Sequence, residues 1–157
     1  DQLTIDRIQL MHPEVREQLE KDYIEINKKL PKGVRLRFTH TYRSPKEQFD
    51  LFRKRPKVTN ADAWQSIHNY GLAFDIVILL DPEGDGKWVA SFKIDKYWKQ
   101  VTAFFKSKGW EAGADWKKFP DPPHFQMDFG YDWRKLKKKI ESGDSFKDDN
   151  GVIYPKL

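Results

Sequence analysis

Two histidines and two aspartates in this chain have residue types and spacing that suit metal-assisted hydrolysis. His68 and Asp75 form one pair, and Asp121 and His124 form a second pair further along the sequence. Two histidines and one carboxylate are a sufficient ligand set for a catalytic zinc ion, which keeps a fourth position open. The remaining carboxylate, that of Asp121, suits the group that takes a proton from the attacking water. Histidines and carboxylates are common enough that such pairs also arise by chance.

The sequence between the members of each pair decides whether they can meet. Two prolines separate Asp121 from His124, and polyproline II geometry would project both side chains to the same side. An ordinary rigid turn is the alternative for this segment. The odd spacing of His68 and Asp75 would point them to opposite faces of one regular strand. The turn signal at residues 69–71 must therefore bend the chain if both are to hold one ion.

Length and composition predict one ordinary globular domain. The chain has 157 residues, of which 38% are hydrophobic and 15% aromatic. A hydrophobic core of this size suits a single domain. No run approaches the roughly 18 apolar residues that span a bilayer. There is no cysteine, so disulfides and cysteine-type zinc sites are excluded and any metal must use histidine and carboxylate ligands.

The charge balance favours polyanionic partners. Lysine and arginine number 29 against 24 acidic residues, a formal net charge of +5. Nucleic acid and a bacterial wall rich in carboxylates and phosphates both fit this charge. A basic run over residues 134–139 is typical of a solvated helix face, with a contact to an anionic wall as the alternative. The aromatic residues recur at helix or strand periodicity, which favours a core over the exposed stacking platforms of a nucleic-acid binder.

Periodicity and capping signals predict helices mixed with strands. Apolar spacing indicates a helix over 13–30, and a Ser-Pro-x-Glu start at Ser44 indicates another that ends near Arg53. Alternation indicates a strand over 34–40. The remaining expected elements are a strand over 72–80, a helix over 95–108, a short strand over 125–129, and a basic helix over 132–142 followed by a polar tail. This order predicts an α+β fold in a single domain, with a small antiparallel sheet flanked by helices.

The acidic segment that begins at Asp81 resembles the start of a calcium loop. The twelfth position of such a loop would be Phe92 rather than glutamate, so we interpret residues 81–86 as a hairpin turn. The chain starts at Asp1 without an apolar leader, which we interpret as a processed or trimmed sequence.

The motifs resemble a known peptidase family. Matching residues are Ser66, His68, Gly71, Ala73 and Asp75, followed by Asp121 and His124, with Tyr42-Arg43-Ser44 and Gln48 upstream and with Trp110 and Asp115-Trp116-Lys117 before Asp121. This pattern is similar to the zinc D-alanyl-D-alanine carboxypeptidase and L-alanyl-D-glutamate endopeptidase family of bacteria and their phages. The resemblance spans about residues 13–129. It implies a single zinc peptidase domain over 1–157, with a core at about 13–130 and a basic helix and tail over 131–157.

The resemblance implies a ligand set and a base. His68, Asp75 and His124 would hold one zinc ion in an open cleft, and Asp121 would be the general base. Arg43 would polarise the scissile carbonyl and stabilise the oxyanion, for which a guanidinium is well suited because it is always charged.

Two further residues would assist at this site. Gln48 would reach the substrate from its helix. Ser66 would support the first ligand or contact the substrate.

The resemblance also implies a substrate. The aspartate base favours peptidoglycan stem peptides cut between L-Ala and D-Glu, with D-Ala–D-Ala carboxypeptidase activity or a non-catalytic zinc or wall-binding module as alternatives. The segment from Arg53 to Val58 is shorter than in many relatives, which predicts that this side of the cleft is uncovered. We expect a monomer with no nucleic-acid partner and no membrane span. It would act in the cell envelope, periplasmic or secreted in a bacterium, or be made in the host cytoplasm before lysis if it belongs to a phage.

Overall fold

An antiparallel sheet forms the centre of the computed structural model of the chain, which describes residues 1–157. The strand order is β1-β2-β5-β4, and β3 pairs with β2 toward its end. The strands are β1 (Val34–His40), β2 (Ala73–Leu80), β3 (Val89–Ser91), β4 (Glu111–Ala112) and β5 (His124–Gln126), and a separate hairpin is made by β6 (Ser145–Lys147) and β7 (Ile153–Pro155). The α+β fold class predicted from the sequence is confirmed.

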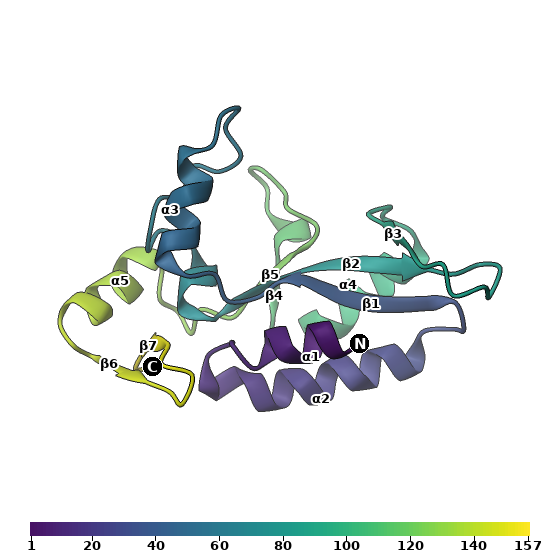
Figure 1. Cartoon of the computed structure of the whole chain (residues 1–157), viewed down its shortest axis with the longest axis horizontal. Helices are drawn as coiled ribbons and strands as arrows, with labels where there is room; N and C mark the ends of the chain where they lie inside the picture. The colour runs from purple at the N-terminus through teal and green to yellow at the C-terminus, as the bar shows by residue number, and fades with distance from the viewer.

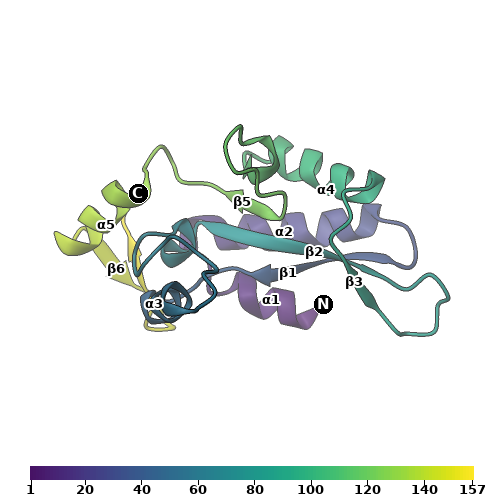
Figure 2. The same ribbon diagram turned by 90° about the horizontal axis from the view of Figure 1, so that it is seen from above.

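Helices cover one face of the sheet and leave room for a cleft on the other. They are α1 (Gln2–Ile8), α2 (Pro13–Lys29), α3 (Pro45–Arg53), α4 (Lys96–Ser107) and α5 (Trp133–Glu141), with short 3₁₀ helices η1 (Ile67–Tyr70) and η2 (Gly113–Asp115). The helices α1 and α2 lie beneath the strands, while α3 rises from the opposite side (Figure 1). Seen from above, β1 and β2 lie over α1 and α2 (Figure 2). No helix is both long enough and apolar enough to cross a membrane.

A group of stacked phenylalanines joins the sheet to the helices. Phe74 of β2 stacks on Phe38 of β1 at a ring distance of 4.2 Å and on Phe125 of β5 at 5.2 Å. Phe105 of α4 meets Phe74 edge-on at 5.1 Å. All four rings are fully buried. Because side chains alternate along a strand, the residues next to Phe74 and Phe125 face the other side of the sheet, where the cleft lies.

Most of the predicted elements are confirmed. The helices α2, α3, α4 and α5 and the strands β1 and β2 lie within a residue or two of their predicted ranges. Ser44 caps α3 through the expected capping box with Glu47. Residues 81–86 make the predicted turn, between β2 and β3. The Asp81 carboxylate accepts hydrogen bonds there from the backbone N–H groups of Asp85 and Gly86.

Two expectations need correction. The strand predicted over 125–129 ends at Gln126, because the chain then turns: the Asp128 carboxylate accepts the N–H of Gly130, and Phe129 has a φ of 55°. The segment after α5 is more than a polar tail, since it forms the β6–β7 hairpin. Helix α1 lies in a region for which no element was predicted.

The hairpin packs against the N-terminal helices. Tyr154 is fully buried, and its hydroxyl donates to the Leu10 carbonyl at 2.6 Å. Arg16 pairs with Asp148 at 2.7 Å. A Cβ on Gly71 would collide with the His12 backbone and the Tyr154 ring, so glycine is needed where these segments meet. The hairpin therefore supports the turn that carries His68.

Tyr154→Ala should lower the free energy of unfolding by about 3 kcal/mol, because it empties a fully buried aromatic site. Urea titration followed by tryptophan fluorescence measures this change. Phe92→Ala is the control, since Phe92 is 59% exposed, and it should change stability by less than about 0.5 kcal/mol. Equal stability of the two variants would show that the hairpin does not support the domain.

Candidate metal centre and cleft

Neighbouring strands bring three of the polar side chains to one level of the sheet. Asp75 on β2 is the cross-strand partner of His124 on β5 and of His40 on β1. A β-bulge between Phe38 and His40 shifts the register of β1 at this point. Directly opposed residues lie close enough for their side chains to interact. The strand pairing therefore places His40, Asp75 and His124 side by side.

His68 reaches the same place from the turn before β2. Ser66 caps η1 by accepting the N–H of His68, and Gly71 ends η1 in the left-handed conformation with a φ of 69°. That conformation favours glycine, which has no Cβ to clash. The chain therefore bends between His68 and Asp75, as the sequence predicted.

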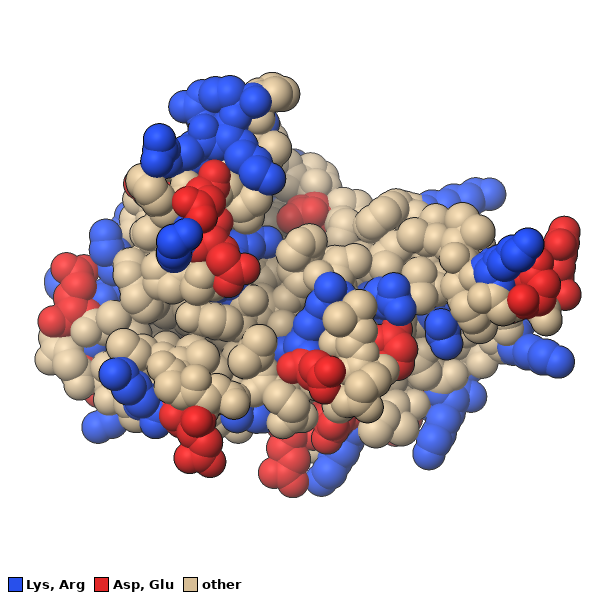
Figure 3. Space-filling model, in the orientation of Figure 1, with Lys and Arg blue, Asp and Glu red and all other residues tan.

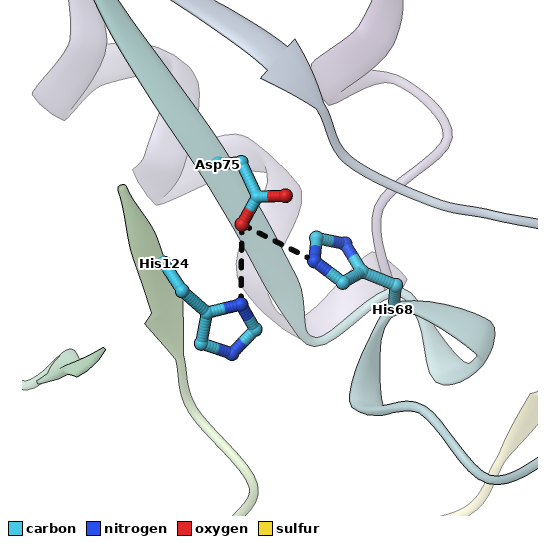
Figure 4. A group of neighbouring side chains, drawn as sticks. All are labelled: His68, Asp75 and His124. Atoms are coloured by element: carbon cyan, nitrogen blue, oxygen red, sulfur yellow. Dashed lines mark hydrogen bonds and ion pairs between the residues drawn. The ribbon is translucent and has the colours of Figure 1, made fainter. Parts of the chain in front are cut away.

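The two histidines and the aspartate converge on one point. Asp75 Oδ1 lies 3.1 Å from His124 Nδ1 and 3.4 Å from His68 Nε2 (Figure 4). One ligand atom from each of the three lies within 4.8 Å of the others. His68 and His124 are buried and Asp75 is half-buried. This cluster has the donor set and compactness to hold a divalent metal ion.

Backbone and side-chain partners fix the ring orientation of each histidine. The Nδ1 of His68 lies 2.7 Å from the Thr41 carbonyl, which accepts its proton and leaves Nε2 free to face Asp75. The Nε2 of His124 lies 2.8 Å from Gln126 Oε1. The amide nitrogen of Gln126 points at the Asp128 carboxylate at 3.4 Å, which can only accept a proton. Gln126 thus presents oxygen to His124, and the Nδ1 of His124 faces the cluster.

The cluster is electrostatically prepared for a cation. Burial opposes the ionisation of Asp75, but its hydrogen bonds to His124 and His68 outweigh burial and hold its pKa well below the usual range. Burial also opposes the charged form of His124, yet Asp75 and Gln126 raise the pKa of His124 overall. The arrangement thus favours the ionised form of Asp75, which lies between the rings of His68 and His124.

Asp121 lies at the solvent-facing edge of the same cleft. The His124 N–H donates to the Asp121 carbonyl at 3.0 Å, which closes a turn instead of the polyproline II segment we expected. The Asp121 N–H donates to the Gly113 carbonyl at 2.9 Å, and a Cβ on Gly113 would collide with the Asp121 backbone. Desolvation and the nearby charge of Asp75 raise the pKa of Asp121. Both Asp121 and His124 line the cleft. The turn through the two intervening prolines therefore places both side chains in the same cleft, as the sequence predicted.

Arg43 projects into the cleft from the segment between β1 and α3. Its side chain donates to Gln48 Oε1 at 3.0 Å, and Gln48 in turn donates to the Ala61 carbonyl at 2.7 Å. Arg43 lines the cleft, whereas Gln48 is fully buried behind it. Gln48 therefore acts on a bound molecule only by orienting Arg43. Ser66 both lines the cleft and supports the backbone of His68.

The cleft has a volume of about 590 Å³ and two walls. Leu51 and Val58, from α3 and the segment that follows it, line one wall, and Trp116 and Asp121, from the loop between β4 and β5, line the other. Figure 1 shows where these segments lie. The side that we expected to be uncovered is lined by Leu51, Val58, Thr59 and Ala61. The short segment after Arg53 rises with α3, so it forms a wall in spite of its length.

Two polar residues of the site were missed by the sequence analysis. His40 lines the cleft with its Nδ1 at 3.8 Å from Asp75 Oδ2, and it was not among the residues predicted for the site. Gln126 also lines the cleft and holds His124. The only available signal for Gln126 was its place two positions after His124, on the same face of a strand.

Comparisons with known proteins agree with this geometry. The sequence profile of the family described as D-alanyl-D-alanine carboxypeptidase matches residues 59–127, a region that contains His68, Asp75, Asp121 and His124. The family resemblance is thereby confirmed. The peptidoglycan L-alanyl-D-glutamate endopeptidase CwlK of Bacillus subtilis (strain 168) is 40% identical over 108 residues. That alignment covers 61% of this chain and 62% of the relative's own length.

A solved structure shares the fold of this chain. The crystal structure of the Serratia marcescens L-Ala D-Glu endopeptidase ChiX matches with a TM-score of 0.58 and 23% sequence identity. The match covers 80% of this chain and 86% of the other. At this identity the likeness supports the fold alone.

Gln126→Ala should weaken divalent-metal affinity about 10- to 100-fold, because the ring of His124 loses its orienting partner. Competition with a chromophoric chelator measures the affinity. Gln126→Glu keeps an oxygen acceptor and should remain near the parent. Gln65→Ala is the matched control, since Gln65 lines the cleft but bonds to Asp62. An unchanged affinity in Gln126→Ala would remove Gln126 from the site.

Proposed function

We propose that this chain is a zinc-dependent peptidase that hydrolyses an amide bond in peptidoglycan stem peptides, between L-Ala and D-Glu. The observation that carries the proposal is the meeting of a His–Asp–His cluster, a second carboxylate and an arginine in one cleft. The similarity to CwlK, which is named for this activity, supports the choice of bond. We assign residues 1–157 to a single peptidase domain.

Zinc fits the residues present. Ligand atoms about 2.0 Å from a tetrahedral ion lie roughly 3.3 Å from one another. The distances of 3.1 and 3.4 Å from Asp75 Oδ1 to the two histidine nitrogens match this spacing. His68, Asp75 and His124 would hold the ion, and bound zinc supplies a Lewis acid that polarises the scissile carbonyl and lowers the pKa of water.

The chain's own residues complete the reaction. Asp121 takes the proton from the attacking water and delivers it to the leaving amine, a role that suits a carboxylate whose pKa is raised. The Arg43 guanidinium, held by Gln48, stabilises the negative charge that develops on the carbonyl oxygen. A module that only binds the wall has no need of a base in this position, which favours an enzyme.

The chain should cleave soluble muropeptides between L-Ala and D-Glu, and a chelator should abolish this cleavage until zinc is restored. Mass spectrometry of the digested muropeptides identifies the bond. Release of D-alanine from a pentapeptide, with the L-Ala–D-Glu bond intact, would instead favour the carboxypeptidase activity for which the matching family is named. Absence of any cleavage by the zinc-loaded chain would contradict the proposal.

Asp121→Asn should reduce turnover of the same muropeptides by about 10²–10⁴-fold, because the amide cannot accept a proton. Zinc content measured by elemental analysis should stay at the parent level, since Asp121 is outside the ligand cluster. Asp115→Asn is the matched control on the same wall, where Asp115 pairs with Lys106 rather than facing the cleft. Equal turnover in both variants would assign the base to another residue.

A further inference from the structure

We propose that the rims of the cleft bind a phosphodiester-rich anionic polymer attached to the cell wall, and that a cationic tip at the end of α3 provides most of this contact. This inference rests on the proposed function, because it adds a partner at the same cleft. The tip consists of Arg53, Lys54, Arg55 and Lys57. Their positive charges gather at the free end of α3 (Figure 3).

The four tip residues are exposed and free of acidic partners. None of them takes part in an ion pair. Elsewhere the chain neutralises many of its cations, as in the pair between Lys46 and Asp50 one turn earlier on α3. Unpaired cations concentrated in one short segment attract polyanions and speed their encounter.

The tip lies directly at the cleft. Leu51 precedes it and Val58 follows it, and both line the cleft. The opposite wall repeats the arrangement, since Lys117 and Lys118 are exposed and stand between the cleft residues Trp116 and Asp121. Neither lysine is ion-paired. Both rims of the cleft are therefore positively charged.

The cationic rims stand apart from the metal centre. The four tip residues, Lys117 and Lys118 are exposed, and none of them is among the residues that line the cleft. A polymer bound along the rims would therefore leave the cleft open, and the peptide attached to the same wall would enter between them.

The form of the tip suits a repeating anion better than a single carboxylate. Its side chains are exposed on either side of Pro56, and Arg55 also donates to the backbone carbonyls of Phe52 and Lys54. No enclosing donors orient one small group there. A phosphodiester polymer presents a fixed charge at every repeat, and the guanidinium groups of Arg53 and Arg55 match phosphate oxygens in a bidentate manner.

A charge-matched pair of variants tests the proposal. The tip variant carries Arg53→Gln, Lys54→Gln, Arg55→Gln and Lys57→Gln. The control variant carries Arg134→Gln, Lys135→Gln, Lys137→Gln and Lys138→Gln on α5, where no side chain lines the cleft and these four are not ion-paired. Both variants lose the same formal charge. Both are made in the full chain with Asp121→Asn, so that binding is measured apart from cleavage.

Binding is measured by sedimentation with Gram-positive sacculi that retain their phosphodiester polymer, and with the same sacculi after the polymer is removed by hydrofluoric acid. The tip variant should bind polymer-bearing sacculi at least about 10-fold more weakly than the control and lose most of its salt dependence. On stripped sacculi the tip and control variants should bind equally. When Asp121 is restored, the tip variant and the control variant should both cleave soluble muropeptide at the rate of the parent chain, because none of the substituted residues lines the cleft.

Three outcomes would overturn the proposal. Equal loss of binding in both variants would show an effect of net charge alone. A tip-specific loss that persists on stripped sacculi would assign the tip to another wall component. The affinity for duplex DNA is measured at the same salt concentration. If it depends on the tip residues and equals the affinity for sacculi, the tip is a nucleic-acid surface. Failure of the proposed peptidase activity would be seen separately, as absence of muropeptide cleavage in chains that still sediment with sacculi.

Discussion

The alternation of side chains on β2 and β5 is the constraint on which the rest of the site depends. Phe74 and Phe125 are cross-strand partners buried in the aromatic core. Their neighbours Asp75 and His124 must therefore face the cleft together. A slip of one residue on either strand would bury a charged group and expose a phenylalanine. The hydrophobic core thus fixes the geometry of the metal centre.

Residues around Asp75 and His124 complete the metal centre. Gly71 turns the chain so that His68 meets Asp75, and the Thr41 carbonyl sets which nitrogen of His68 faces the cluster. Gln126 does the same for His124. Ligands held this way need little reorganisation when an ion binds, which is how outer partners support metal affinity. The two walls then add Asp121, Arg43 and the positively charged rims to the cleft.

The sequence predicted the local features well because their causes are local. The helix that starts at Pro45 follows from Ser44 and Glu47 alone, and β2 follows from an uninterrupted apolar run. The β6–β7 hairpin was missed because its stability comes from contacts of Tyr154 and Asp148 with α2 and the preceding turn, which are distant in sequence. The strand at 125–129 was overextended because the turn after Gln126 depends on a single carboxylate bond at Asp128.

The sequence by itself determined which residue types are present for metal chemistry, their order, and the turn that must separate His68 from Asp75. Only the tertiary structure decided that His40 and Gln126 join them, that Gln48 lies behind Arg43, and that the tip of α3 becomes a rim. The reason is that strand register and wall placement depend on contacts between distant segments. Spacing along the chain shows which side chains could form one site. The packing of the sheet on its helices determines which side chains come into contact.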